Sequence, residues 1–240
     1  MKIILSAFTV LIIALSCKKP LTERVHFTST SYQNLATFDN TGKPNNLEAS
    51  DAISSNLLSF ITTTLPENTN LATTNSDLLS SSAIGDIPIL QRLDVSITFV
   101  SEGASKANAF AFYTYPTSSP PKGAKDIKTI TYVFPNAGAG TTLQRGNKVK
   151  LGSFEPGISI GFVLIQGAWD ANTKNLNNGA VHFCSNDVLN PEVDPRLKKH
   201  AVLINYPLEN KVLIGFEDLD RTQGSDNDFN DLVIYATVTP

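Results

Sequence analysis

The chain has 240 residues, of which 41% are hydrophobic, so it is long enough to bury one core of ordinary size. Its formal net charge of -3, together with a sequence that shows no basic patch, excludes nucleic acid as an expected partner. It has two cysteines, and the first directly follows an N-terminal apolar run, so we expect neither a disulfide framework nor a cysteine-based metal site.

The N-terminus has the pattern of an export signal. Lys2 gives it a positive start, residues 3–15 form an apolar run, and Cys17 follows small residues. About 13 apolar residues are too few for a membrane span, which needs roughly 20, so we expect a signal peptide over residues 1–16. The site resembles the cleavage site of bacterial lipoproteins, with Ala14 where leucine is usual. This resemblance implies acylation of Cys17 and a lipid anchor in the cell envelope, with the outer membrane as the expected location; plain secretion is the alternative.

Between the anchor and the main domain the sequence predicts two segments without a core of their own. Residues 17–37 are polar and are expected to form a lipidated tether or an irregular edge. Residues 38–92 are expected to form a small annex with helical and irregular structure. Apolar residues recur there at helical spacing before Pro66, and Ser50 or Asp51 is the expected N-cap of that helix.

From residue 93 the pattern changes to short strands separated by turn residues. Nine strands with no helix-length segment between them predict an all-β domain over residues 93–240, an antiparallel two-sheet β-sandwich of jelly-roll type. The N-terminal annex is expected to pack on this sandwich. The expected strands are residues 95–100, 110–115, 127–134, 149–154, 158–165, 181–184, 201–205, 212–216 and 232–238.

The most distinctive stretch lies between the last two expected strands. It holds six carboxylates and only one basic residue, Arg221; the carboxylates belong to Glu217, Asp218, Asp220, Asp226, Asp228 and Asp231. At an effective dielectric of about 20, two carboxylates about 4 Å apart repel each other by roughly 4 kcal/mol. Ca²⁺ takes about 6–8 oxygen ligands and would offset that repulsion. We therefore expect a calcium site here, and a solvated acidic hairpin tip is the alternative.

The spacing within this stretch excludes an EF-hand. Asp226, Asp228 and Asn230 match the first three ligand positions of such a loop, but Asp231 stands where the invariant glycine belongs. The flanking segments are also predicted strands, whereas an EF-hand has helices. In a straight strand Asp231 would face away from the other three residues, so the loop must bend if all four are to converge. Gly224 supplies a bending point.

Several segments resemble the bacterial domain family DUF4114, which also occurs in LruC-type proteins. They are FVSEGA at residues 99–104 and VLIGFEDLDR with GSDNDFNDLVI at residues 212–234, and the similarity covers about residues 93–238. The resemblance implies a β-sandwich in a secreted or surface protein, often within adhesin-like chains, with no established catalytic activity. It implies calcium ligands at Glu217, Asp218, Asp226, Asp228 and Asp231.

Two further residues complete the expected metal site independently of the resemblance. Asn230 offers an amide oxygen within the acidic stretch. Glu102 stands at the end of a predicted strand beside Gly103, where its side chain can reach a neighbouring loop. The expected cofactor is therefore calcium alone.

The sequence favours a binding protein over an enzyme. It lacks the G-x-S-x-G, H-E-x-x-H and phosphate-loop patterns, and acids in one loop do not flank a sugar from opposite faces, so we expect no catalytic residues. The favoured function is a recognition or adhesion module on the envelope that binds a glycan or an envelope protein. A structural lipoprotein in which calcium only staples a loop is the alternative, and a glycoside-active enzyme is less favoured.

Overall fold

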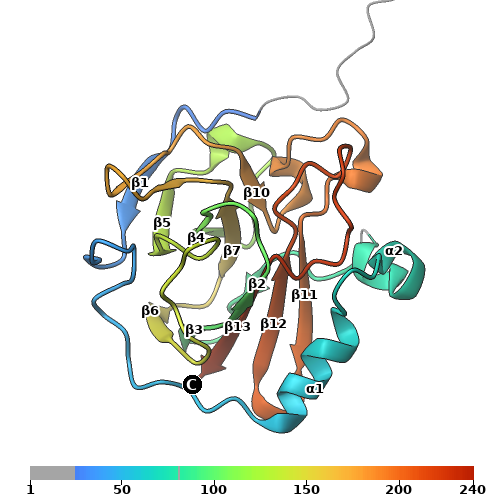
Figure 1. Ribbon diagram of the computed structural model, residues 1–240, viewed down its shortest axis with the longest axis horizontal. Coiled ribbons are helices and arrows are strands. Elements are labelled where there is room, and N and C mark those ends of the chain that lie inside the picture. Colours follow the sequence, from blue (N-terminus) through green and yellow to red (C-terminus); the bar gives the residue numbers. More distant parts are fainter. Residues whose placement is uncertain (1–24, 81) are drawn as a thin grey trace, which may run out of the picture.

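The structure is a computed structural model that describes residues 25–80 and 82–240 (Figure 1). The predicted signal peptide, the predicted lipidation site Cys17 and the first part of the expected tether therefore lie outside the described residues.

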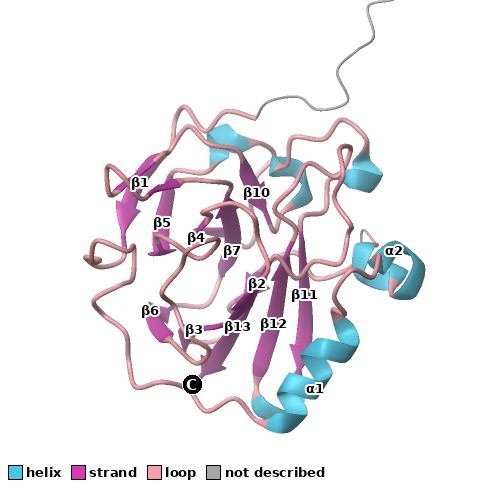
Figure 2. Ribbon diagram, in the orientation of Figure 1, coloured by secondary structure: helices cyan, strands magenta, loops and turns pink. Residues whose placement is uncertain are grey.

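Two β-sheets pack face to face in the described part of the chain and confirm the predicted all-β sandwich (Figures 1 and 2). The first sheet has the strand order β1-β5-β4-β7-β10, with β2 paired to β7, and the second has the order β11-β12-β13-β3-β6. A short ribbon of β8 and β9 stands apart. All pairs are antiparallel except β1 with β5, which is parallel.

The nine predicted strands all form, with ends that differ by a few residues from the prediction. They are β3 (Leu93–Glu102), β4 (Ala109–Pro116), β5 (Thr129–Phe134), β6 (Lys148–Phe154), β7 (Ile158–Ile165), β10 (His182–Cys184), β11 (Ala201–Tyr206), β12 (Lys211–Phe216) and β13 (Leu232–Thr239). Four short strands were not predicted: β1 (Ser31–Asn34), β2 (Ile87–Pro88), β8 (Trp169–Asp170) and β9 (Asn175–Leu176). Strand β1 lies in the segment expected to be a tether or an irregular edge, and its polar residues bond to β5 through the backbone.

The core between the sheets is rich in phenylalanine. Phe110 of β4 lies at its centre, with its ring centroid 6.0 Å from that of Phe162 and 6.1 Å from that of Phe216. All three side chains are fully buried, which contributes about 1.5–3 kcal/mol each. This cluster joins the two sheets and fixes the end of β12, where the acidic loop begins.

Helix α1 (Ser55–Thr64) packs on the outer face of the second sheet, as Figure 1 shows beside β11 and β12. Its N-cap is Ser54, whose hydroxyl accepts a hydrogen bond from the Leu57 backbone N–H at 3.0 Å, so the prediction of Ser50 or Asp51 was wrong. Asp51 has a different role, because its carboxylate accepts a hydrogen bond from the Tyr235 hydroxyl at 2.6 Å. That contact holds the chain before the helix against β13.

The remaining helical segments are short. They are α2 (Leu71–Thr74) and the 3-10 turns η1 (Ser76–Leu79), η2 (Ala124–Asp126), η3 (Asp187–Leu189), η4 (Pro195–Leu197) and η5 (Pro207–Glu209). Within the described residues, the helices are too short to pass through a bilayer.

The loop between β12 and β13 folds back against the sheet. Phe229 is fully buried together with Leu65 and other residues of the helical annex, although its φ of 59° lies in the left-handed region that bulky residues avoid. A Cβ atom at Gly215 would lie 2.3 Å from the Phe229 carbonyl oxygen and 2.6 Å from Leu65 Cδ1. The acidic loop is therefore a packed part of the fold, and the alternative of a loose acidic tip does not describe it.

We expect Gly215→Ala to destabilise the protein by about 1–3 kcal/mol, because the added methyl group overpacks the contact between β12 and the loop. Urea unfolding followed by circular dichroism measures this loss. Gly123→Ala is the matched control, since a Cβ at Gly123 meets nothing within 4 Å. If the two variants are equally stable, the close approach of Gly215 to Phe229 and Leu65 is contradicted.

Candidate metal centre

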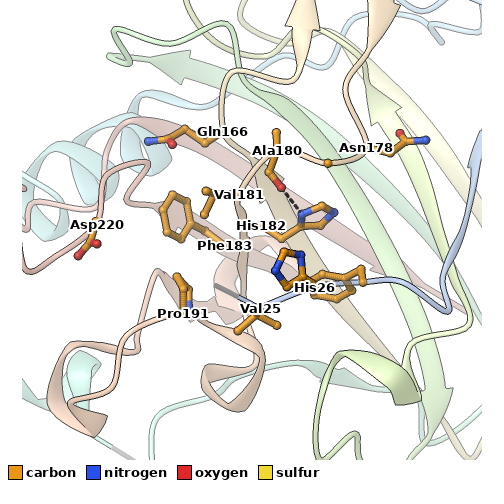
Figure 3. A pocket seen from close by; sticks show the side chains of 12 residues that line it. Val25, His26, Gln166, Asn178, Ala180, Val181, His182, Phe183, Pro191 and Asp220 are labelled. Atoms are coloured by element: carbon orange, nitrogen blue, oxygen red, sulfur yellow. Dashed lines mark hydrogen bonds between the residues drawn. The ribbon is translucent and has the colours of Figure 1, made fainter. Parts of the chain in front are cut away.

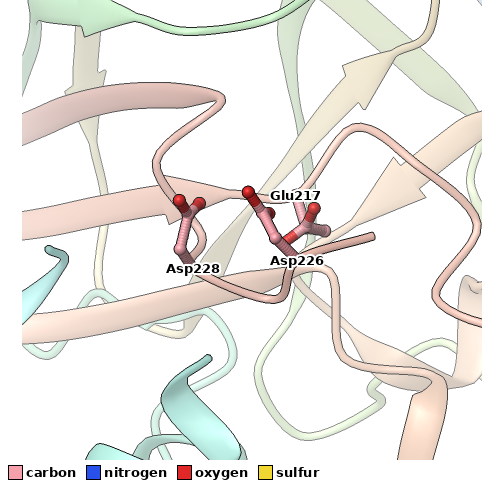
Figure 4. A group of neighbouring side chains, drawn as sticks. All are labelled: Glu217, Asp226 and Asp228. Atoms are coloured by element: carbon pink, nitrogen blue, oxygen red, sulfur yellow. The ribbon is translucent and has the colours of Figure 1, made fainter. Parts of the chain in front are cut away.

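Three carboxylates converge where the acidic loop leaves β12. One oxygen from each of Glu217, Asp226 and Asp228 can be chosen so that all three oxygens lie within 4.8 Å of one another (Figure 4). Glu217 and Asp228 are buried, whereas Asp226 is exposed. A cation about 2.4 Å from each ligand holds opposite ligands about 4.8 Å apart, so the group has the dimensions of a calcium site. The exposed side at Asp226 leaves the group open to solvent.

The loop reaches this shape through left-handed backbone positions. Gly224 has a φ of 87°, as the predicted bend requires, and Asn227 and Phe229 also have positive φ values of 62° and 59°. The Asn68 backbone N–H donates a hydrogen bond to Asp228 Oδ2 at 2.8 Å. Because the helical annex supplies this donor, the annex takes part in positioning one of the three carboxylates.

Asp218 and Asp231 lie beside the three converging carboxylates. The Asp218 backbone N–H donates to Asp231 Oδ2 at 2.7 Å, and the Asp231 carboxyl shares a hydrogen bond with that of Glu217. Asp218 Oδ2 accepts a hydrogen bond from Asn108 Nδ2 at 2.7 Å. Asp218 and Asp231 are therefore bonded to each other, and Asp231 is also bonded to Glu217.

Asn230 and Glu102 stand at the far side of the loop. The Asn230 backbone N–H donates to Asp228 Oδ1 at 3.2 Å, and the side chain of Asn230 points toward the Gly103 turn. Glu102 ends β3 and pairs with Leu232, the first residue of β13. Its Oε2 atom is buried and has no hydrogen-bond partner. Both residues line a cavity of about 360 Å³ next to the acidic loop.

Among the described residues, the buried acids Glu217, Asp218 and Asp228 form no ion pair. The exposed Asp226 and the neighbouring Asp231 form none there either. Arg221 is buried, but its Nε donates to Asn227 Oδ1 at 2.6 Å and one of its Nη atoms donates to the Lys199 carbonyl at 3.0 Å. A buried carboxylate without a paired charge is costly, so the loop must bind protons or a cation.

Without a metal ion, burial favours the protonated form of the acidic side chains in the loop. Burial, and then the charge of Asp231, raises the pKa of Glu217 to about 8. Burial, and then the charge of Asp218, raises the pKa of Asp231 to about 7. Burial also raises the pKa of Asp218 and of Asp228. A divalent cation would replace these protons, because its charge favours the ionised form of every ligand.

Several residues of this region were missed by sequence reasoning. Asn68 and Asn108 hold carboxylates from far along the chain, and His200, fully buried, contacts the Glu217 carbonyl through Nδ1 at 3.1 Å. His200 Nε2 in turn lies 2.6 Å from Glu192 Oε1. Only the fold brings these residues to the loop, and no local pattern marks them.

The fold and the loop together define a β-sandwich domain with an acidic cluster at one end. Residues 154–239, which include this loop, match a family described as a domain of unknown function (DUF4114). The match begins at the end of β6, later than the resemblance from residue 93. No curated protein and no solved structure matches the chain.

In the presence of a chelator, the free energy of unfolding should fall as the pH rises from about 6.5 to about 8. Glu217 and Asp231 hold protons in the folded state that they release near pH 4 when unfolded, so their stabilisation is complete at low pH and is lost as the pH passes their folded pKa values. Each titrating group contributes up to about 1.4 kcal/mol per pH unit. Urea unfolding at several pH values measures the slope.

The pH range starts at about 6.5 because of His182. Burial lowers the pKa of His182 to about 4 in the folded protein, so this group makes the free energy of unfolding rise with pH between about 4 and about 6.5. Glu217→Gln should flatten the slope, since it removes the group with the higher pKa. Stability that stays constant or rises over this window in chelator would contradict the burial of these acids.

Proposed function

We propose that this protein is a calcium-binding, lipid-anchored cell-envelope protein that acts as a non-catalytic recognition or adhesion module. The observation that carries the proposal is the convergence of Glu217, Asp226 and Asp228 to within 4.8 Å. Two of these carboxylates are buried, and none has an ion-pair partner within the described residues. A bound cation would make that arrangement favourable.

The chemistry of the donors favours calcium. All three groups offer oxygen, which hard cations prefer over the nitrogen and sulfur ligands of zinc. Carboxylates can bind Ca²⁺ through one oxygen or two, and water can enter beside the exposed Asp226, so a coordination number of about 6–8 is reachable. The next candidates, as ligands or as groups that orient them, are Asp231, which bonds to Glu217, Asn230, which bonds to Asp228, and then Asp218 and Glu102.

Calcium bound here would link the end of β12 to the loop. Glu217 directly follows the last residue of β12, while Asp226 and Asp228 lie farther along the loop, so one ion would cross-link the two segments. All three acids come from one loop and its junction with β12, so they do not flank a sugar from opposite faces, and this favours a binding role over a catalytic one.

The envelope location rests on the sequence before the described residues. If Cys17 carries the acyl chains, the eight residue steps to Val25 span at most about 28 Å. The sandwich would then stay close to the membrane surface. A structural role, in which calcium only stabilises the loop, is the second candidate, and it is favoured if no ligand is found.

Calcium at 100 times its Kd should raise the free energy of unfolding by about 2.7 kcal/mol over that in chelator, because the ion binds only the folded state. Asp228→Asn should abolish this shift; its one side-chain oxygen can keep the Asn68 hydrogen bond, while the longer bond from the Asn230 N–H is lost. Thermal melts of the two proteins in calcium and in chelator measure the effect.

Asp220→Asn is the control for that experiment, because Asp220 lies outside the converging group and its Oδ1 bonds to Thr222 are kept by asparagine. This variant should retain the full calcium shift. Melting curves of the unmodified protein that coincide in calcium and chelator would refute calcium binding. A shift that survives in Asp228→Asn would place the ion elsewhere.

Cys17→Ser should abolish lipid attachment, since acylation of a lipoprotein needs the thiol. Labelling of growing cells with a palmitate analogue, followed by membrane fractionation, measures this. We expect the unmodified chain to be labelled and to sediment with membranes, and the variant to be unlabelled. An unlabelled native chain would contradict the anchor and favour secretion.

A further inference from the structure

Three lysines stand close together in the loop that contains η2. This lysine loop, residues 122–128, holds Lys122, Lys125 and Lys128 and a single acid, Asp126, so its formal charge is +2, whereas the whole chain carries -3. All four side chains are exposed. Three lysines are too few for the basic stripe of a nucleic-acid-binding protein, but they make the loop a local positive surface.

The described chain begins at a defined place on the sandwich. The Phe27 ring stacks on the His182 ring, with ring centroids 4.4 Å apart. Figure 3 shows Val25 and His26 beside His182, at the wall of a cavity of about 290 Å³. The position of residue 25 is therefore fixed by packing.

The lysine loop lies beside this starting point. Phe27 is buried in one hydrophobic cluster with Ala124 and Ile127 of the loop, and Val25 packs against that cluster. The Thr30 hydroxyl donates a hydrogen bond to the Ile127 carbonyl at 2.7 Å. In Figure 1 the start of the described chain and the yellow-green turn η2 both lie at the top of the molecule. Residue 25 and the lysine loop therefore share one end of the sandwich.

A groove of about 440 Å³ has two of the lysines in its lining. Lys122 and Lys128 line it together with Asp126, Tyr115 and the prolines of the preceding turn. Asp126 Oδ2 accepts a hydrogen bond from the Lys122 backbone N–H at 2.8 Å. Lys128 Nζ donates to the Lys125 carbonyl at 3.0 Å, and an ammonium group has two further N–H bonds to offer. Lysine binds phosphate as a point charge, so a phosphate group fits between these side chains.

The chain before residue 25 keeps this end near a membrane if Cys17 is acylated. The eight residue steps from Cys17 to Val25 span at most about 28 Å. Residues 18–24 contain three basic residues and one acid. Together with the lysine loop, six basic residues and two acids belong to the part of the protein that the anchor would bring to the membrane.

The acids of the neighbouring turns η3 and η4 are balanced by basic partners. Asp187 lies 3.2 Å from Lys199 Nζ, and Asp194 lies 2.6 Å from an Nη atom of Arg196. These turns, orange in Figure 1, lie at the same end as the start of the described chain. Their ion pairs limit the repulsion that their acids would exert on an anionic surface.

We propose that the lysine loop docks onto the anionic phospholipid headgroups of the membrane that holds the chain, an inference that rests on the proposed acylation of Cys17. Anionic lipids attract lysine and arginine near a membrane surface and strengthen binding about fivefold for each residue. Lys122 and Lys128 bind headgroup phosphate in the groove, and Lys125 lies against the surface beside it. The turn between β11 and β12, at the opposite end of the molecule in Figure 1, then faces away from the membrane.

Fluorescence energy transfer from the protein to the bilayer tests this orientation. The mature, acylated chain carries a donor dye at Ser118→Cys, an exposed position near the lysine loop, while Cys184 is buried and does not react. The chain is reconstituted into vesicles that contain an acceptor-labelled lipid. The vesicles are pure phosphatidylcholine, or phosphatidylcholine mixed with phosphatidylglycerol. Chelator is present throughout, so that calcium cannot bridge protein and lipid.

Transfer from the dye at Ser118→Cys should be higher in the mixed vesicles than in pure phosphatidylcholine. It should fall to the phosphatidylcholine level in high salt, because salt screens the attraction. A second sample carries the dye at Leu208→Cys, an exposed position in η5 between β11 and β12. Its transfer should not rise in the mixed vesicles, since docking holds that end away from the bilayer.

A triple variant locates the docking surface. Loss of the three lysines should weaken docking on the order of 100-fold and abolish the gain in transfer. The substitutions are Lys122→Gln, Lys125→Gln and Lys128→Gln. The control makes the same change of charge at surface lysines outside the loop, with Lys43→Gln, Lys150→Gln and Lys174→Gln, and should keep the gain. Each variant is first checked by its melting curve, and the salt dependence of the unmodified lysines remains decisive if the triple variant fails to fold.

The outcomes separate docking from anchoring. Equal transfer from Ser118→Cys in the two kinds of vesicle, on a chain that stays with both, overturns docking and leaves the anchor intact. A gain that survives in a folded triple variant also overturns it. A gain that inorganic phosphate removes more strongly than chloride of equal ionic strength identifies a site for the free ion and overturns the lipid surface.

A chain that does not stay with phosphatidylcholine vesicles overturns the proposed anchor. In that case, binding to the mixed vesicles that needs the three lysines still supports the docking surface. The absence of such binding overturns the docking surface as well.

Discussion

The burial of acidic side chains at the end of β12 is the constraint on which the rest of the structure depends. Glu217, Asp218 and Asp228 are each about 1% exposed and have no ion-pair partner among the described residues. Carboxylates prefer water, so this arrangement persists only because the surrounding fold enforces it. The fold supplies backbone and side-chain hydrogen-bond donors. Their hydrogen bonds satisfy individual carboxylate oxygens but do not neutralise the net negative charge of the acids. The cation that we propose would supply positive charge at this point.

The sandwich explains how such an arrangement is held. Strand β12 lies between β11 and β13 in the second sheet, and the phenylalanine core under Phe216 fixes its end. On the other side of the sheet, Phe229 anchors the returning loop among the apolar residues of α1. The acids between these two anchors cannot spread apart without unpacking one of them. In the absence of metal these acids hold protons, which a bound cation would displace.

The sequence predicted the strands of the sandwich because each has a run of apolar residues that faces a core. It missed β1 and β2 because polar or two-residue strands carry no such pattern, and their partners β5 and β7 are distant in the chain. For the site, the acidic stretch and the bend at Gly224 were visible. Which acids meet was not, because it depends on left-handed turns at Asn227 and Phe229. The contacts from Asn68 and Asn108 cross 160 and 110 residues, beyond the reach of any local motif.

The most direct test of the central claim is a crystal structure of the protein crystallised with calcium, in which the anomalous scattering of the ion is recorded. We predict one strong peak among Glu217, Asp226 and Asp228, with oxygen ligands at about 2.3–2.6 Å. The absence of a peak there at saturating calcium, with the three side chains turned apart into water, would contradict the account.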